Sequence, residues 1–537
     1  MSSRRTSSHP AAEAIIDELA RCGLRHLVLS PGSRSAPIVI AAHHHPAIHI
    51  TVALDERSAA HIALGMTLKD GAPVAVLSTS GTAAINHGPA LAEAHFAGHP
   101  IISITADRGP ETRHRGHGQT AHQPGLFAPH VAASLDLDET ALDAEELRAA
   151  VRRVWPLLTA PDRQPVHINV PFDESLYETA EVTDSLERSD VPSANPAPAE
   201  LPDDWMDFLG CHAPRVLLLA GADVDFWRCE GRAELLEALG SRLAVWADRL
   251  SGLPTDWADE AWLLPEWPAD LAPDVVITTG LPPMSKHIRR ALGDTEPVHL
   301  HIGPCSKDIW GRGVSAWPVS TATGLTALAE ALPEFNAFAE DWQVARDRQF
   351  HTTNKPQAWS DHAVFAALAE LLATRPPASI HFANSTAARL LQRVNWPQAS
   401  RLHANRGVAG IDGCTSTAVG DALRHPDQEV VLVTGDTAWL YDLNGLHVQP
   451  FPSNLRILVI DNAGGQIFRW LPGPTAVGLT EPYFAAPPTA SLEATADLHR
   501  LHFAGRATTE AEWIRMSRVW LEHSGPSLLI ADLTSRE

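Results

Sequence analysis

Cysteine is scarce in this sequence, and no two cysteines form a Cys-x-x-Cys pair. The five cysteines are Cys22, Cys211, Cys229, Cys305 and Cys414. An odd, scattered set argues against a disulfide framework and a structural zinc site, and it fits a reducing cytoplasm. Long apolar runs are also missing, because no segment approaches the ~18 residues of a membrane span. The N-terminus leads into an amphipathic helix with Asp17 and Glu18, unlike a secretory signal.

Lysine is equally rare, and the four lysines are Lys69, Lys286, Lys307 and Lys355. Positive charge is therefore almost all arginine, whose planar fork suits carboxylates, although coding bias or a salty cytoplasm would give the same composition. With 41 basic and 64 acidic residues the net charge is −23, which repels nucleic acid and anionic membranes. No Gly-Lys dipeptide occurs, which excludes a Walker-type phosphate loop.

The chain is long enough for several domains, because 537 residues exceed a single hydrophobic core. Its 45% hydrophobic and 20% charged residues are typical of a folded globular enzyme. Apolar runs alternate with helical patterns, which is the rhythm of a parallel sheet covered on both faces. The first predicted strands lie at 26–30, 49–54, 74–79, 101–106 and 166–171, with helical patterns at 56–69 and 81–98.

Two interruptions divide this rhythm. A Pro-rich acidic stretch at 191–205 reads as a linker, and the polar segment from about Glu334 to Ser360 carries no clear period. We therefore predict an α/β protein of three tandem doubly wound parallel-sheet domains, at 1–190, 205–333 and 355–537. Ligands of such sheets bind at the carboxyl ends of strands, so residues that follow strands are the candidates for function.

Two oxygen-bearing side chains follow adjacent predicted strands of the last domain. Asp436 follows the strand VVLVT and Gly435, and Asn462 comes 26 positions later at the end of the strand LRILVID. Mg²⁺ prefers oxygen ligands and takes few from protein, completing its octahedron with phosphate and water. These side chains, with the carbonyl of Gly464, would form such a site. Alternatively, Asp436 is a helix N-cap and Asn462 a turn residue.

The pattern Gly-Asp-Thr…Asn at 435–462 resembles the Gly-Asp-Gly…Asn signature of thiamine diphosphate enzymes. It departs at Thr437, where glycine is common, and at Ala463, where a second polar residue often stands. The resemblance implies that Asp436, Asn462 and Gly464 hold thiamine diphosphate through Mg²⁺ or Mn²⁺. Gly435 and Thr437 would lie beside the cofactor.

The same resemblance implies a glutamate in the first domain that hydrogen-bonds the aminopyrimidine N1′, so that the 4′-imino group deprotonates the thiazolium C2. Glu56 matches that position, and its neighbour Asp55 does not. Either carboxylate could simply cap the following helix. The cofactor would span the pyrimidine-binding domain (1–190) of one subunit and the diphosphate-binding domain (355–537) of another. A homodimer or dimer of dimers follows.

Further blocks resemble one family among these enzymes, the 2-succinyl-5-enolpyruvyl-6-hydroxy-3-cyclohexene-1-carboxylate (SEPHCHC) synthases of menaquinone biosynthesis. The blocks are SPGSRSAPI at 30–38, DERSAAHIALG at 55–65, TSGTAAIN at 79–86, TADRGPE at 105–111, HINVPFDESLY at 167–177, ANRGVAGIDG at 404–413, YDLNGL at 441–446 and GGQIF at 464–468. They cover both outer domains. The central domain matches chiefly through MSKHIRR at 284–290.

This resemblance implies the substrates 2-oxoglutarate and isochorismate, which carry four carboxylates between them. An acidic protein must then concentrate cations in its pocket. The candidate substrate-binding residues are Ser33, Arg34, Arg108, Lys286, Ser385, Arg389 and Arg406. Each of the arginines follows a predicted strand or lies in the first turn of a helix, although singly any of them could be a solvated surface residue.

At several further positions the sequence matches the family only in part. Gln119 resembles a family glutamine that contacts the intermediate or the acceptor, but Gly118 stands where relatives can carry asparagine. After Lys286 comes His287, where a second strong base is familiar, and Arg289 or Arg290 would be the residue to compensate. Three apolar residues would bend the cofactor and desolvate the reacting carbon, unless they are ordinary core. They are Ile411, Ile467 and Phe468.

Several segments resemble nucleotide-binding or metal-binding motifs but lack the context that those motifs need. GHGQTA at 116–121 fits a dinucleotide fingerprint but begins ten residues after its strand. The histidines at 43–45, His114 and His117 lack a carboxylate or cysteine partner at metal-ligand spacing, so we interpret them as surface residues.

We therefore expect this chain to be a cytoplasmic transferase in which Glu56 and Gln119 are catalytic. It would decarboxylate 2-oxoglutarate and add the succinic semialdehyde carbanion to isochorismate. Two alternatives remain: another thiamine diphosphate 2-oxoacid decarboxylase or carboligase, similar to acetohydroxyacid synthase, and a catalytically silent cofactor-binding scaffold.

Overall fold

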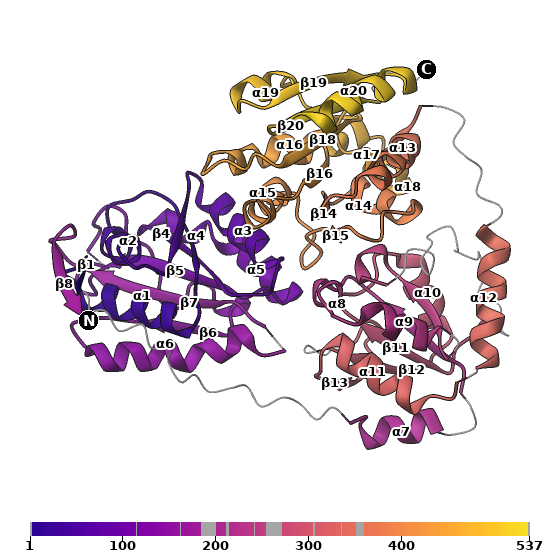
Figure 1. Cartoon of the computed structure of the whole chain (residues 1–537), viewed down its shortest axis with the longest axis horizontal. Coiled ribbons are helices and arrows are strands. Elements are labelled where there is room, and N and C mark those ends of the chain that lie inside the picture. The colour runs from indigo at the N-terminus through magenta and orange to yellow at the C-terminus, as the bar shows by residue number, and fades with distance from the viewer. Residues whose placement is uncertain are drawn as a thin grey trace.

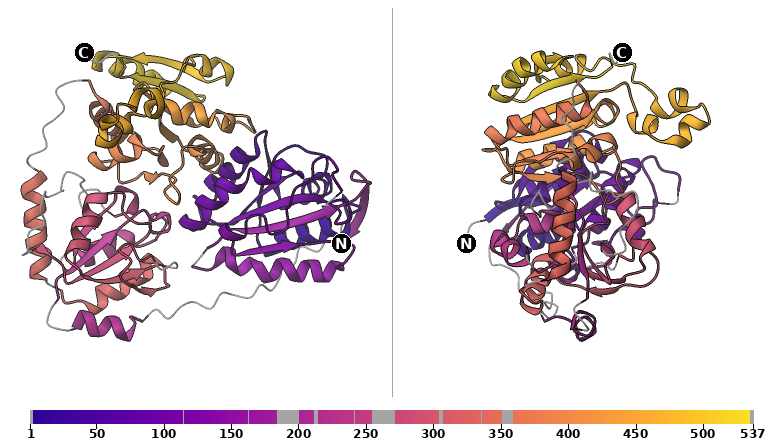
Figure 2. Two further views of the ribbon diagram at one scale, coloured as in Figure 1. Left: turned by 180° about the vertical axis from the view of Figure 1, so that it is seen from behind. Right: turned by 90° about the vertical axis from the view of Figure 1, so that its right-hand side faces the viewer.

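Three parallel sheets, each covered by helices, make up the computed structural model of this chain (Figure 1). We call each sheet with its helices the first, central and last unit. The structure describes residues 3–113, 115–161, 163–183, 200–210, 214–240, 242–253, 271–303, 307–334, 336–350 and 359–534. The views in Figure 2 show the last unit lying across the other two. The predicted α/β fold class is confirmed.

The first sheet has the strand order β3-β2-β4-β5-β7-β6, and these six strands are parallel. They are β2 (His26–Leu29), β3 (His49–Ala53), β4 (Val74–Ser78), β5 (Ile101–Arg108), β6 (Ala133–Asp136) and β7 (Val166–Phe172). An added edge strand, β17 (Val448–Gln449), comes from the last unit and pairs antiparallel with β3. A separate antiparallel pair joins β1 (Ser3–Ser7) and β8 (Thr179–Thr183).

Helices cover both faces of this sheet because its strands are apolar on both sides. The helices are α1 (Pro10–Cys22), α2 (Ala36–His43), α3 (Glu56–Thr67), α4 (Thr82–Ile85), α5 (Gly88–Ala97), η1 (Ala128–His130) and α6 (Ala144–Thr159). Leu27 and Leu29 of β2 pack with α1, α2 and α6, whereas Val28 between them packs with α3 and α5. This alternation follows the two-residue period of a strand.

The last sheet has the order β15-β14-β16-β18-β20-β19 and is also parallel. Its strands are β14 (Ser379–Phe382), β15 (Arg401–His403), β16 (Val430–Gly435), β18 (Leu455–Asp461), β19 (His502–Ala507) and β20 (Ser527–Asp532). Its helices are α13 (Asp361–Thr374), α14 (Thr386–Leu390), η5 (Leu391–Arg393), α15 (Cys414–Arg424), α16 (Asp436–Tyr441), η6 (Leu443–Leu446), α17 (Gln466–Trp470), α18 (Pro472–Ala476), η7 (Thr480–Ala485), α19 (Ala494–Leu498) and α20 (Glu510–Glu522). When the parallel strands of each unit are numbered along the chain, the first and last sheets share the order 2-1-3-4-6-5.

Helices α3 and α15 join the first and last units and share one apolar core (Figure 1). Two glycines allow their backbones to touch. A Cβ on Gly65 would lie 2.0 Å from the carbonyl oxygen of Thr417, and one on Gly420 would lie 2.1 Å from that of Ile62. The two helices therefore pack at a distance that no larger side chain permits at these positions.

The central sheet is parallel with the order β10-β9-β11-β12-β13. Its strands are β9 (Val216–Ala220), β10 (Ala244–Ala247), β11 (Val275–Thr279), β12 (Val298–Ile302) and β13 (Ser315–Trp317). The helices are α7 (Asp203–Gly210), α8 (Val224–Trp227), α9 (Arg232–Leu239), η2 (Arg249–Ser251), α10 (Lys286–Asp294), α11 (Thr321–Ala331) and α12 (Ala337–Phe350).

Three differences from the sequence expectations concern helices. The last residues of the linker predicted at 191–205, from Asp203 on, belong to α7. The helical pattern at 81–98 forms two helices, α4 and α5, because Pro89 occupies the first turn of α5 and ends the run before it. The segment from Glu334 to Ser360, where no period was evident, contains α12, whose Phe338 and Trp342 pack on the central sheet.

Composition argued against a disulfide framework and against a membrane span. Cys22, Cys229 and Cys414 are free thiols, and Cys211 and Cys305 lie outside the described residues. Among the helices of the described ranges, none combines the length and apolar character needed to cross a bilayer.

Candidate active site

A cavity of about 250 Å³ lies at the carboxyl edge of the last sheet. Nine of the predicted site residues line it, namely Ser385, Ile411, Gly435, Asp436, Thr437, Asn462, Gly464, Ile467 and Phe468. They come from the ends of β14, β16 and β18, from the loop before α15 and from helix α17. Because β14 and β16 are neighbours whose connections run to opposite sides, this is the switch point where open parallel sheets bind ligands.

Asp436 is the buried carboxylate of this cavity. Its Oδ2 accepts a hydrogen bond from the Gly464 N–H at 2.7 Å, and its Oδ1 accepts one from the Thr437 N–H at 2.6 Å. The Thr437 hydroxyl also donates to Oδ1 at 3.2 Å, a contact that the glycine common at this position could not make. Burial raises the pKa of the Asp436 carboxyl, while these N–H donors lower it.

Asn462 lies beside Asp436 on a loop whose backbone is fixed. The carbonyl oxygens of Asn462 and Ala463 accept from the Arg469 guanidinium at 3.0 and 2.8 Å, and Arg469 is also paired with Glu481. Gly464 has φ +99°, and a Cβ there would lie 2.2 Å from the Ala485 carbonyl oxygen. Only glycine fits, which sets the position of the Gly464 backbone against Asp436.

The cavity fits a diphosphate only together with a cation. Among the described residues no lysine or arginine lines it, and Asp436 adds negative charge. A polyanion there would be repelled unless a divalent ion lay between, and a carboxylate, an amide and a carbonyl are the oxygen donors that Mg²⁺ accepts. Among the described residues, no group of three or more histidines, cysteines or carboxylates is arranged to hold a metal ion, and a site completed by amide and phosphate oxygens needs no such group.

Asn384 organises the loop on the other side of the cavity. Its Nδ2 donates to the carbonyl oxygens of Asn405 and Gly410 at 2.7 and 2.6 Å, and its Oδ1 accepts from Arg406 at 2.7 Å. Burial lowers the pKa of Arg406 and the nearby Asp248 raises it. Arg389 is the next cation, with its Nη1 donating to the Ser385 carbonyl oxygen at 2.8 Å. Arg389 and Arg406 thus form a pair of cations beside the cavity.

The apolar wall combines predicted and unpredicted residues. Ile411, Ile467 and Phe468 line the cavity together with Phe484, whose ring centroid lies 5.6 Å from that of Phe468. Sequence reasoning missed both Phe484 and Asn384. Asn384 immediately precedes the candidate residue Ser385 in the segment NSTAAR at 384–389, and that position was the available signal. Phe484 follows no strand and carries no local signal.

A second group of predicted residues lies at the carboxyl edge of the first sheet. The loop after β2 touches the loop after β4, because the Arg34 N–H donates to Thr79 Oγ1 at 3.2 Å. The Arg34 guanidinium donates to the Phe172 carbonyl oxygen at 2.9 Å and pairs with Glu174 at 3.1 Å. Ser33 is exposed beside it.

Gln119 and Arg108 belong to the same edge. Gln119 is exposed with φ +57°, and a Cβ on Gly81 would lie 3.1 Å from its Cα. Arg108 ends β5 and is half-buried. Lys286, by contrast, is exposed at the start of α10 in the central unit. The structure thus gathers Ser33, Arg34, Arg108 and Gln119 near one edge, and Lys286 belongs to another unit.

Glu56 is the first residue of α3 and is half-buried. Asp55, not Glu56, caps this helix, since Asp55 Oδ1 accepts from the N–H groups of Arg57 and Ser58 at 2.9 and 3.2 Å. The last unit fixes the cap, because Asn444 Nδ2 donates to Asp55 Oδ2 at 2.7 Å. Glu56 is therefore not used as the cap, and it does not line the Asp436 cavity of its own chain.

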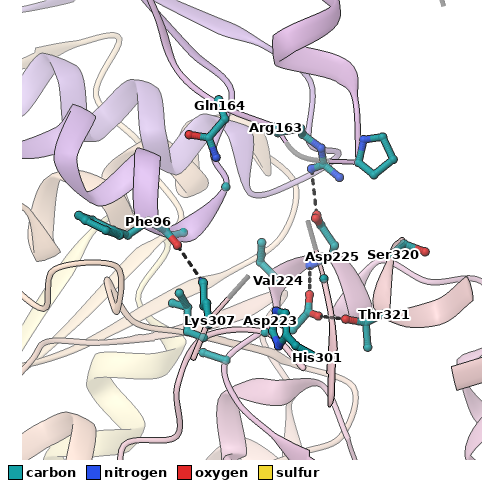
Figure 3. Close-up of a pocket in the computed structure, with 17 residues that line it drawn as sticks. Phe96, Arg163, Gln164, Asp223, Val224, Asp225, His301, Lys307, Ser320 and Thr321 are labelled. Carbon is teal, nitrogen blue, oxygen red and sulfur yellow. Dashed lines mark hydrogen bonds and ion pairs between the residues drawn. The ribbon is translucent and has the colours of Figure 1, made fainter. Parts of the chain in front are cut away.

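Another cavity, of about 120 Å³, separates the first and central units (Figure 3). Its charged groups are engaged with protein. Arg163 pairs with Asp225 at 2.9 Å, Lys307 donates to the Phe96 carbonyl oxygen at 3.2 Å, and Thr321 donates to Asp223. None of the predicted site residues lines this cavity.

The site and fold define a thiamine-diphosphate-dependent enzyme, and a family model described as "Thiamine pyrophosphate enzyme, N-terminal TPP binding domain" matches residues 9–126. Close relatives carry the name 2-succinyl-5-enolpyruvyl-6-hydroxy-3-cyclohexene-1-carboxylate synthase. One from Desulfotalea psychrophila is 35% identical over 86% of this chain and 87% of its own length. Another from Flavobacterium psychrophilum is 31% identical over 86% and 85%, and one from Halorubrum lacusprofundi is 32% identical over 92% and 88%. The chain belongs to the family of SEPHCHC synthases.

Proposed function

We propose that this enzyme decarboxylates 2-oxoglutarate with thiamine diphosphate and adds the resulting four-carbon carbanion to isochorismate, giving SEPHCHC for menaquinone biosynthesis. The observation that carries the proposal is the cavity with buried Asp436 and Asn462 at two strand ends, in a chain of this family. We infer that it acts in the cytoplasm.

Thiamine diphosphate supplies the nucleophilic carbon and the electron sink for decarboxylation. Asp436, Asn462 and the Gly464 carbonyl would hold Mg²⁺ or Mn²⁺, and that ion would balance the diphosphate. Gly435 and Thr437 flank it. The apolar side chains of Ile411, Ile467 and Phe468 would exclude water from the reacting carbon, where desolvation favours loss of CO₂.

We infer that Glu56 of the partner subunit holds the proton at the aminopyrimidine N1′, so the enzyme is a homodimer or a dimer of dimers. Glu56 does not line the cavity of its own chain, which supports a second copy as its source. Large apolar side chains are also exposed, including Leu54 at 63% and Tyr483 at 73%. Such exposure is typical of a surface that another chain covers.

The four substrate carboxylates would be bound mostly by arginine. The proposed set is Ser33, Arg34, Arg108, Lys286, Ser385, Arg389 and Arg406, with Gln119 contacting the reacting groups. Cations held at fixed positions orient the donor and acceptor relative to each other, which is the proximity contribution to catalysis. We assign residues 1–190 to pyrimidine binding, 355–537 to diphosphate binding, and 205–333 to a central domain.

A donor assay tests the chemistry directly. Purified protein with thiamine diphosphate and Mg²⁺ should release CO₂ from 2-oxoglutarate and consume isochorismate, and pyruvate should be a poor donor. Preference for pyruvate would favour an enzyme similar to acetohydroxyacid synthase. Absence of turnover with either donor would support a catalytically silent scaffold.

A complementation experiment tests the shared site. Glu56→Gln and Asp436→Asn chains should each be inactive, but in mixed dimers one of the two sites has both native residues. If chains pair at random, the mixture should regain about a quarter of the native activity, since half of the dimers are mixed. No recovery, with mixed dimers verified by mass spectrometry, would place both residues in one chain.

A further inference from the structure

Glu93 is a buried carboxylate that reaches from the first unit into the last. It lies on α5, is only 2% exposed, and was not among the predicted site residues. Its Oε1 accepts the N–H of Gly407 at 2.6 Å, and its Oε2 accepts the N–H of Val408 at 2.8 Å. The side chain therefore joins two units through the backbone of a single loop.

The backbone amides of this loop stabilise the charged form of Glu93. Burial raises the pKa of the carboxyl, while the N–H groups of Val408, Gly407 and Ala409 and the charge of Arg406 lower it. Consecutive amides that converge on one carboxylate form a concave anion site. Glu93 is thus held by the loop, and the loop is held by Glu93.

The loop from 404 to 413 also packs tightly on the first unit. A Cβ on Gly407 would lie 2.5 Å from the carbonyl oxygen of Glu93, and one on Gly413 would lie 2.0 Å from the ring of His61 on α3. Ala409 between them has φ +60°. A non-glycine residue rarely adopts this conformation unless the surroundings impose it.

The same short loop carries two residues of the proposed site. Arg406 precedes the first amide held by Glu93, and its guanidinium donates to Asn384. Ile411 lies two residues after Ala409 and lines the cavity. Any shift of residues 407–409 therefore moves the proposed substrate cation and the apolar wall together.

We propose that Glu93 is a positioning residue that fixes Arg406 and Ile411 by holding the amides of residues 407–409. The proposal rests on the proposed function for the roles of Arg406 and Ile411. Glu93 does not line the Asp436 cavity. It acts through the loop, so its loss changes how well the site is formed and leaves its chemical groups in place.

Glu93→Gln and Glu93→Asp test this proposal in the full-length enzyme. In Glu93→Gln an amide NH₂ faces a backbone N–H, which forces the loop to shift. A displacement of about 1 Å costs about a hundredfold in rate. We expect kcat/KM to fall about a hundredfold, with KM for isochorismate raised and thiamine diphosphate binding weakened about tenfold in calorimetry with Mg²⁺. Glu93→Asp keeps the charge and should recover part of both.

Glu18→Gln is the matched control, because the Glu18 side chain is fully buried on α1, on the opposite face of the first sheet. It should lower the thermal midpoint and leave KM and cofactor affinity unchanged. Glu93 variants that lose stability with native KM and cofactor affinity would overturn the proposal. If the native enzyme binds cofactor but fails to turn over 2-oxoglutarate, the proposed function fails, whereas the binding comparison still tests Glu93.

Discussion

The first and last sheets share one strand order, yet the residues at their carboxyl edges differ in chemistry. The edge of the last sheet carries Asp436, Asn462 and apolar side chains around a cavity. The edge of the first sheet carries Arg34, Arg108 and Gln119. Topology thus determines where a ligand site forms, and the residues after each strand determine what it binds.

The two units also support each other's edges. Glu93 of the first unit holds the loop that carries Arg406 and Ile411, and Asn444 of the last unit holds the cap of the helix that begins with Glu56. Each unit therefore depends on its neighbour for the geometry of its own candidate residues. If the two edges differ as their chemistry suggests, substitutions at each should have different effects on cofactor and substrate binding.

The largest expected effect is at the last edge. Asp436→Asn removes the anionic ligand of the proposed cation. A bound cation in such a site stabilises the transition state by several kcal/mol. We expect kcat/KM to fall about a thousandfold or more and Mg²⁺-dependent binding of thiamine diphosphate to be lost, while far-UV circular dichroism stays native. If calorimetry showed that Asp436→Asn still binds the cofactor, the last edge would not be the cation site that we propose.

At the first edge, Arg108→Gln should affect substrate only. A charge-assisted hydrogen bond to a carboxylate contributes about 1.5–3 kcal/mol, so KM for an acidic substrate should rise about 10- to 100-fold. Cofactor affinity should remain native, which calorimetry can measure on the same sample. Equal losses of substrate and cofactor binding would show that Arg108 does not act on the substrate alone.

Asp442 lies where the first and last units meet, and its carboxyl group makes stability depend on pH. Its Oδ2 accepts from the Ser416 N–H at 2.7 Å, and burial raises its pKa to about 7 from an unfolded value of 3.8. A raised carboxyl pKa contributes stability at low pH that is lost as pH rises through about 7. Asp442→Asn should therefore gain about 2 kcal/mol relative to the native chain between pH 5.5 and pH 8. Parallel curves in urea unfolding would contradict this.

A smaller effect with the opposite sign is expected at His99, whose ring centroid lies 6.2 Å from that of His403 across the same junction. Burial lowers the pKa of His99 to about 3 from 6.5, so its contribution to stability is present above pH 6.5 and lost on acidification. Below pH 6.5, a buried neutral histidine lowers the free energy of unfolding by about 1.4 kcal/mol for each unit that the pH falls. His99→Asn should flatten the fall in stability between pH 6.5 and 5, and a fall as steep as that of the native chain in urea unfolding would contradict this.

Much of the fold could be predicted because it depends on local patterns. Alternating apolar and helical runs identified the parallel sheets, and Asp436 and Asn462 attracted attention because each follows such a run. The contact between Glu93 and residues 407–409 could not be predicted, since it joins residues more than 300 positions apart and no local pattern pairs Glu93 with that loop. Phe484 and α12 were missed for the same reason, because tertiary packing decides their positions.

The strand β17 limits how this protein can be divided. Val448 and Gln449 close the free edge of β3, with Val448 opposite Ala53. An unpaired strand edge invites pairing with other chains and hence aggregation. A fragment ending before the last unit would expose that edge together with the apolar face of α3, so the first unit should be insoluble when expressed alone. Cutting the chain between Thr183 and Glu200 would leave both contacts intact, and a nicked enzyme should remain assembled.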